Sequence, residues 1–128
     1  MHNTSTQAAT ILLAHGSSDP NWVLPFESLT QRIRHSMDSS RVELAYMELA
    51  SPSLQQQVAQ LAEEGYSRID ILPLFFAAGR HLRKDVPQQL EELQRQHMVK
   101  LKLHPPVGLE PEVADAISAV VLRSLTQA

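Results

Sequence analysis

Apolar and polar residues alternate in blocks along the chain, and these blocks predict strands and helices in turn. Short apolar runs typical of buried strands occupy residues 9–14, 42–47, 69–76 and 99–103. After each run, apolar residues recur every three or four positions, a spacing that predicts an amphipathic helix. The predicted order is therefore a strand followed by a helix, four times over.

The predicted helices have recognisable ends. The first begins between Pro20 and Pro25, because proline is tolerated only near a helix start. The second has Ser51 as its N-cap, Pro52 in its first turn and Gly65 as its C-terminal stop. Apolar stripes on the first and last helices are predicted to be buried: Trp22, Phe26, Leu29, Ile33 and Met37 in the first, and Val113, Ile117, Val120, Val121 and Leu125 in the last.

The third apolar run and the turn after it are the most informative part of the chain. Residues Ile69–Phe76 are almost all apolar, which predicts a strand covered on both faces. The chain then turns at Gly79, and a basic cluster containing His81 follows. Asp85, with Gln88 three residues later, resembles a capping box and predicts the start of the next helix.

Alternating strands and helices predict an α/β fold of one domain. We expect a flavodoxin-like three-layer sandwich, in which a four-stranded parallel sheet has helices on both faces. Ligands of such sheets bind outside the carboxyl ends of the strands. The loops at that edge contain three histidines and one carboxylate, from segments far apart in sequence: His15, Glu48, His81 and His104.

Composition narrows the classes of protein that fit this pattern. A chain of 128 residues is long enough for one domain, which we place at residues 9–128 after a flexible polar leader at residues 1–8. Without cysteine, any metal ion must be bound by nitrogen and oxygen. The formal net charge of -3 argues against a nucleic-acid partner. No apolar run approaches the ~20 residues of a membrane span, and no signal peptide is evident, so we expect a cytoplasmic protein without a membrane partner.

Imidazole and carboxylate groups suit Zn, Co, Ni or Fe ions. These residues form no compact metal motif such as HExxH, so each keeps an ordinary alternative role. His15 could be a turn residue that bonds the backbone, His81 a solvated histidine and His104 a loop residue before two prolines. Glu48 is equally consistent with a solvated charge at a strand end.

Two further polar groups lie at the same predicted edge. The turn Gly16–Ser18, at a helix entrance, could bind an anion through backbone N–H groups. It matches neither GxxxxGK[ST] nor GxGxxG, which argues against a nucleotide site, and Ser17 lacks the GxSxG setting of a hydrolase nucleophile. Arg80, Arg83 and Lys84 predict an exposed helix start that also faces the edge, where they could contact carboxylates of an acidic ligand.

Three segments resemble, in order, the motifs of the CbiX/SirB family of sirohydrochlorin chelatases. They are ILLAHGSSDP at residues 11–20, YMELASPSL at 46–54 and PLFFAAGRHLRKDVP at 73–87. The resemblance runs from Ile11 to Leu109. Many members have arginine after the HGS turn, where this chain has Ser18. With no internal repeat, the chain resembles the short, single-unit form of the family, which works as a homodimer with its site in the cleft.

The resemblance implies a chelatase-like fold and an activity. The activity is insertion of Co2+ or Fe2+ into sirohydrochlorin, in cobalamin or siroheme biosynthesis. The family's two metal-binding histidines fall on His15 and His81, and its acidic position falls on Glu48. Glu48, or a histidine once it has released the metal, would accept a proton. No permanent cofactor is needed, because the metal is a substrate; Ni2+ also suits such ligands.

The same edge is expected to contact the substrate. The residues expected to bind the tetrapyrrole are Gly16, Ser17, Gly79, Arg80, Arg83 and Lys84, of which the three basic ones are proposed from charge alone. The alternative to an enzyme is a carrier of the same fold, which binds the metal or the tetrapyrrole without catalysing insertion.

Overall fold

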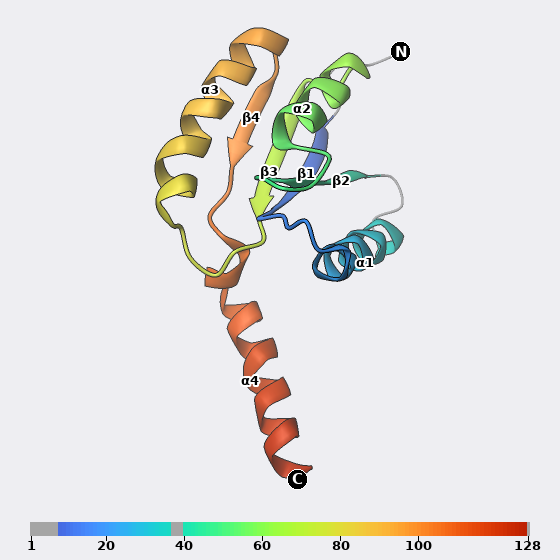
Figure 1. Cartoon of the computed structure of the whole chain (residues 1–128), viewed down its shortest axis with the longest axis vertical. Coiled ribbons are helices and arrows are strands. Elements are labelled where there is room, and N and C mark those ends of the chain that lie inside the picture. Colours follow the sequence, from blue (N-terminus) through green and yellow to red (C-terminus); the bar gives the residue numbers. More distant parts are fainter. Residues whose placement is uncertain (1–7, 37–39, 128) are drawn as a thin grey trace.

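The computed structural model describes residues 8–36 and 40–127 (Figure 1). Four parallel strands form a sheet in the order β2, β1, β3, β4. The strands are β1 (Ala8–Ala14), β2 (Arg41–Tyr46), β3 (Arg68–Pro73) and β4 (Lys100–Leu103). The helices are α1 (Pro20–Ser36), α2 (Leu54–Glu63), α3 (Val86–His97) and α4 (Pro111–Thr126), with a π-helical turn η1 (His81–Asp85) and a 3-10 turn η2 (Val107–Leu109). The predicted α/β fold with a four-stranded parallel sheet is confirmed.

The sheet has a different cover on each face, because successive side chains of a strand point to opposite sides. Ile11 and Leu13 of β1 are buried in the larger core, which includes residues of α2 and α3. Leu12 and Ala14 belong to a second core, which includes Phe26 and Ile33 of α1. Helices α2 and α3 therefore cover one face, and α1 covers part of the other.

The N-cap of α2 differs from the prediction. Ser53 rather than Ser51 caps the helix: its hydroxyl accepts from the Gln56 N–H at 3.1 Å, and the Gln56 side chain accepts from the Ser53 N–H at 2.8 Å. This reciprocal capping box sets the helix start two residues later than expected. Gly65, with φ +99°, follows the last turn as predicted.

The third strand is shorter and less covered than its apolar sequence predicts. It ends at Pro73, and Phe76 is exposed. Its residues facing α2 and α3 are buried, whereas Asp70, Leu72 and Leu74, on the α1 side, are only half-buried. The prediction of a strand covered on both faces is wrong for the α1 side, because α1 packs mainly on β2.

The last helix leaves the rest of the molecule. Figure 1 shows α4 running away from the carboxyl edge of the sheet, roughly along the strand direction. Its predicted buried stripe is largely exposed as a result. No helix within residues 8–36 and 40–127 is both long and apolar enough to cross a membrane. Apart from Ala8, which belongs to β1, the predicted leader lies outside the described residues, as does Met37 of the predicted α1 stripe.

Candidate active site at the carboxyl edge of the sheet

The turn after β1 is locked to the turn after β2. Gly16 has φ +99°, and a Cβ placed on it would lie 1.8 Å from the carbonyl oxygen of Glu48. The Glu48 N–H donates to the carbonyl of His15 at 3.1 Å, and the Met47 N–H donates to that of Ala14 at 2.9 Å. Because no side chain fits between the two turns, His15 and Glu48 are fixed as neighbours by the backbone.

Tyr46 packs against the contact between these two turns. Its Cβ would lie 3.2 Å from a Cβ on Gly16, and its side chain is 1% exposed. The hydroxyl is buried with no hydrogen-bond partner among the described residues. Burial raises the pKa of Tyr46, and the nearby charge of Glu27 adds to the rise. The phenol therefore stays neutral as a packing group under the turn.

The His15 ring stacks on Phe75, which follows β3. The ring centroids are 4.0 Å apart and the planes differ by 20°. Phe75 is 6% exposed and belongs to the larger core, so it gives the exposed imidazole a rigid support. The loop after β3 thus orients a side chain that is delivered by β1.

His81 begins the π-helical turn η1. Its Nδ1 lies 2.7 Å from Oδ2 of Asp85, four residues later. With its proton on Nδ1, the imidazole donates to Asp85 and leaves the Nε2 lone pair free to bind a metal. Asp85 precedes α3 but makes no capping hydrogen bond, so the capping-box interpretation was wrong: its carboxylate is used by His81 instead.

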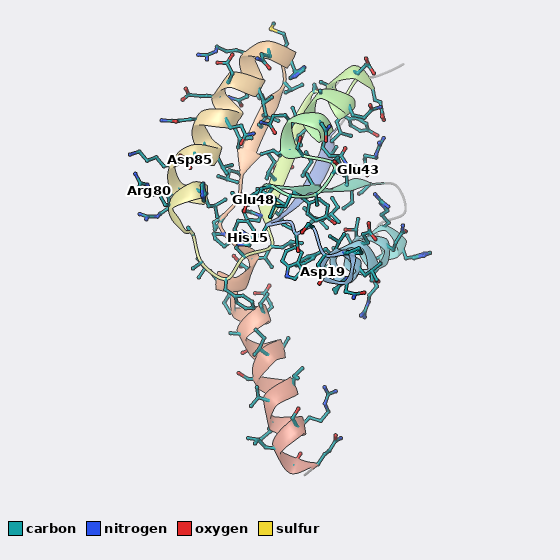
Figure 2. The ribbon with its side chains drawn as sticks, in the orientation of Figure 1. His15, Asp19, Glu43, Glu48, Arg80 and Asp85 are labelled. Carbon is teal, nitrogen blue, oxygen red and sulfur yellow. The ribbon has the colours of Figure 1, made fainter. Side chains whose placement is uncertain are left out.

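These turns enclose one cavity. Its volume is about 160 Å³, and its polar lining contains His15, Glu48, His81 and Asp85. The remaining lining residues are Met47, Leu54, Val86 and Gln89. Figure 2 shows His15 and Glu48 together at the sheet edge, with Asp85 on the side of η1 and α3. The structure thus brings together the two histidines and the carboxylate that sequence reasoning selected.

The cavity offers nitrogen and oxygen donors of the kind that bind Co, Fe or Ni ions. Within the part of the chain that the structure describes, no group of three or more His, Cys, Asp or Glu side chains is arranged to hold a metal ion. The titratable groups of the lining are two imidazoles and two carboxylates, of which Asp85 is engaged by His81.

The remaining predicted site residues lie around the cavity rather than in its lining. The Ser17 hydroxyl accepts from the Asp19 N–H at 3.0 Å, in the turn that leads into α1. Arg80, Arg83 and Lys84 are exposed at η1, and Figure 2 shows Arg80 on its outer side. Gly79 is exposed, and a Cβ there would meet no atom within 4 Å. Contact of Gly16, Ser17 and these four residues with a substrate stays a prediction.

His104 does not join the cavity. It follows β4 as expected, but its Nε2 lies 2.9 Å from Oδ1 of Asp70. Asp70 alternates with buried Ile69 and Ile71 and therefore lies on the α1 side of the sheet. Because His104 contacts Asp70 on the α1 side, it is absent from the cavity lining, which supports its alternative role as a loop residue.

Sequence reasoning missed most of the cavity lining, above all Asp85. The four-residue spacing between His81 and Asp85 was a usable signal, because residues four apart on a helix are neighbours. The prediction that Asp85 caps the next helix placed His81 ahead of that helix, so their contact was not predicted. The apolar wall gives no sequence signal of its own, because Leu54 and Val86 resemble any core residue.

Comparison with known proteins decides the family. The sequence model of the CbiX family matches residues 9–124. The chain belongs to the CbiX family. A sirohydrochlorin cobaltochelatase of Sulfurisphaera tokodaii is 32% identical over 120 residues, which cover 91% of this chain and 96% of that protein. A sirohydrochlorin ferrochelatase of Priestia megaterium is 26% identical, over 85% of this chain and 41% of that protein.

Solved structures of CbiX and SirB proteins share the fold. The crystal structure of a putative cobalamin biosynthesis CbiX protein from Marinobacter aquaeolei VT8 is 43% identical, with a TM-score of 0.86, and covers 94% of this chain and 99% of that one. SirB from Bacillus subtilis, solved with Fe3+, has a TM-score of 0.78 at 18% identity, and covers 89% of this chain and 46% of that one. The Marinobacter protein is similar to this chain in both sequence and fold. The similarity to SirB concerns the fold alone.

Proposed function

We propose that this CbiX chain is a chelatase that inserts a divalent metal ion, Co2+ or Fe2+, into sirohydrochlorin. The proposal rests on one observation: His15, Glu48 and His81, from three turns far apart in sequence, line the same cavity. Relatives named sirohydrochlorin cobaltochelatase and ferrochelatase support the same reaction. Co2+ and Fe2+ both suit imidazole ligands, and Ni2+ does so as well.

The two imidazoles would hold the metal substrate for transfer. Two protein nitrogens leave several coordination positions of the ion to water, and ring nitrogens of the tetrapyrrole can replace that water one at a time. The stacking of His15 on Phe75 and the Asp85 hydrogen bond of His81 fix the direction of both rings. Fixed ligands reduce the rearrangement needed when the ion moves to the macrocycle.

Glu48 would accept a proton during insertion. A divalent ion replaces two pyrrole N–H protons of the macrocycle, so bases beside the ion lower the barrier. Glu48 would accept one of the two protons, and a histidine that has released the metal would accept the other. Glu48 lines the same cavity as both histidines and needs no movement to reach it.

We expect Glu48→Gln to slow insertion by about 10²- to 10⁴-fold, the range of general acid–base catalysis, while metal binding persists. Initial rates measured across pH test this, with Glu63→Gln on the surface of α2 as the matched control. A pH–rate profile identical to that of the unchanged chain would contradict the assignment.

Basic residues around the cavity would orient the substrate. Sirohydrochlorin carries several carboxylates, and Arg80, Arg83 and Lys84 present three cations at η1. Exposed ion pairs contribute only about 0–1 kcal/mol each, so these residues would act as a group. Backbone groups of Gly16, Ser17 and Gly79 would contact the same substrate. We further propose a cytoplasmic homodimer whose two cavities open into one cleft.

The activity is tested by absorbance spectra of sirohydrochlorin with Co2+ or Fe2+ under anaerobic conditions, with and without the protein. We expect the metallated spectrum to develop many times faster with catalytic amounts of protein, over several turnovers. Metallation at the spontaneous rate, despite tight binding of the metal or the tetrapyrrole, would identify a carrier and overturn the proposal.

A further inference from the structure

The cavity lining contains a thioether side chain to which the proposed function assigns no role. Met47 lines the cavity together with His15, Glu48 and His81. It is half-buried and packs against the larger core, on the side of the sheet that α2 and α3 cover. Because a thioether sulfur can bind a metal ion, the position of Met47 relative to the histidines decides what it can do.

Met47 is the neighbour of His15 across two parallel strands. The register of β1 and β2 ends with Ala14 beside Tyr46, so the next residues of the two segments are His15 and Met47. The Met47 N–H donates to the Ala14 carbonyl at 2.9 Å and holds the segments together beyond the strands. Ala14 and Tyr46 both belong to the smaller core, so the residues after them point to the opposite face, toward the cavity. Adjacent strands lie about 4.8 Å apart, so His15 and Met47 enter the cavity side by side.

The His15 ring has a neighbour on each side along the sheet. Phe75, which follows β3, stacks on the ring with the centroids 4.0 Å apart. Strand β1 lies between β2 and β3, so Met47 lies on the side of His15 away from Phe75. The methionine side chain has three rotatable bonds and adapts to the space around it. An ion bound to His15 in the cavity is therefore within reach of the Met47 thioether.

The apolar part of the lining favours a protein ligand at this position. Leu54 and Val86 line the cavity, are each 2% exposed and offer no hydrogen-bond partner. A buried water molecule needs about two to four polar partners, so water on the ion that faces these residues is poorly held. Among the apolar lining residues only Met47 has a side-chain lone pair, and it can replace such a water.

We propose that the Met47 thioether is a third ligand of the metal substrate, beside the two imidazoles, an assignment that rests on the proposed function because it concerns the same ion in the same cavity. Methionine sulfur binds iron in haem proteins, so the ligand suits at least one of the two metals in question. With His15 and Met47 on neighbouring segments and His81 on η1, the three ligands approach the ion from two sides of the cavity.

A ligand of this kind serves selection and release. Mg2+ and Mn2+ prefer oxygen ligands, so a soft thioether in place of a water disfavours them relative to Co2+ and Fe2+. The thioether is also neutral and a weak ligand, so a ring nitrogen of the tetrapyrrole can replace it easily. Met47 would therefore favour the metals to be inserted without retaining them.

X-ray absorption at the cobalt edge tests the ligation directly, because the chain has no cysteine and any protein sulfur beside the metal must come from methionine. The protein is loaded with less than one equivalent of Co2+ in a buffer free of thiols and chloride. We expect the unchanged chain to show imidazole scattering and a sulfur neighbour at bonding distance. Met47→Leu, which nearly keeps the size of the side chain, should lose the sulfur and keep the imidazoles. Met98→Leu, at a position that is 87% exposed, is the matched control and should retain both.

The other possible spectra overturn the assignment in distinguishable ways. Imidazole scattering without sulfur in the unchanged chain would make Met47 a packing residue and would leave the metal-binding histidine pair intact. A sulfur neighbour that persists in Met47→Leu would assign the ligand to another methionine. Absence of imidazole scattering would overturn the histidine pair, and the Met47 ligand with it.

Metal selectivity gives a second measurement that does not depend on the spectra. Calorimetric titration compares Co2+ with Mn2+ in the unchanged chain, in Met47→Leu and in Met98→Leu. We expect Met47→Leu to bind Co2+ severalfold more weakly while its affinity for Mn2+ is unchanged, and Met98→Leu to match the unchanged chain. The same ratio of the two affinities in Met47→Leu as in the unchanged chain would contradict a thioether ligand.

Discussion

At the scale of single residues, the geometry of the site depends on one glycine and one hydrogen bond as well as on the ligands themselves. Gly16 lets two turns approach until His15 and Glu48 are adjacent. Asp85 orients His81 through a contact of 2.7 Å. Neither residue stands out by type or by hydrophobic pattern, whereas His15 and His81 could be selected from their places at strand ends.

Gly16→Ala should destabilise the protein by about 2–5 kcal/mol. The left-handed backbone costs a residue with a Cβ about 1–2 kcal/mol, and forcing apart packed groups costs about 1–3 kcal/mol more. Gly65→Ala is the matched control, because Gly65 has the same φ of +99° with nothing within 4 Å. Urea denaturation measures both, and equal losses in the two variants would show that the contact with Glu48 contributes nothing.

Asp85→Ala should weaken Co2+ binding by about 10- to 100-fold, as loss of a carboxylate behind a metal-binding histidine usually does. Asp85→Asn retains an oxygen that can accept from Nδ1 and should lose less. Glu91→Ala, which removes an exposed carboxylate from α3, controls for net charge. Calorimetric titration with Co2+ makes the comparison, and unchanged affinity in Asp85→Ala would remove its orienting role.

At the scale of elements, hydrophobic periodicity predicted the four strands and the four α-helices but neither η1 nor η2, and side-chain contacts set the ends of the elements. The apolar run 69–76 suggested a long strand, yet only part of it pairs with neighbours, and β3 ends at Pro73. The cap of α2 moved from Ser51 to Ser53, since only Ser53 exchanges hydrogen bonds with Gln56. Such choices between adjacent candidates depend on distances, which the sequence does not contain.

An ion-pair network joins α2 to the edge strand β2. Arg41 contacts both Glu43 and Glu64, and these carboxylates raise the pKa of its guanidinium. The Arg41 hydrogen bond, followed by that of Gln60, lowers the pKa of Glu64 from its ordinary value of 4.5. Both side chains are partly exposed, so the network is sensitive to salt.

The lowered pKa of Glu64 predicts how stability varies with pH. A carboxyl group with a depressed folded pKa stabilises the protein above its unfolded pKa, and this contribution disappears as pH falls through the folded pKa. Glu64→Gln should therefore be less stable than the unchanged chain at pH 7, and the difference should shrink below about pH 4.5. Urea midpoints measured from pH 7 to pH 3 test this, with Glu63→Gln as control; a constant difference across pH would refute it.

At the scale of the whole molecule, topology predicted the position of the site but not the position of α4. Parallel strands bring their following turns to one edge whatever the details, so His15, Glu48 and His81 could be placed together from strand order alone. His104 reached the same edge but turned to Asp70 on the other face. The amphipathic stripe of α4 predicted burial, but the stripe is largely exposed because the helix runs away from its own sheet.

The central claim is that His15 and His81 together hold the metal that enters the tetrapyrrole. It is tested most directly by initial rates of sirohydrochlorin metallation with Co2+ and with Fe2+, under anaerobic conditions, for His15→Ala, His81→Ala and the exposed control His35→Ala. We predict that either site substitution reduces the rate to the spontaneous value with both metals and leaves the circular dichroism unchanged, whereas His35→Ala retains full activity. Full activity in both site variants would contradict the account.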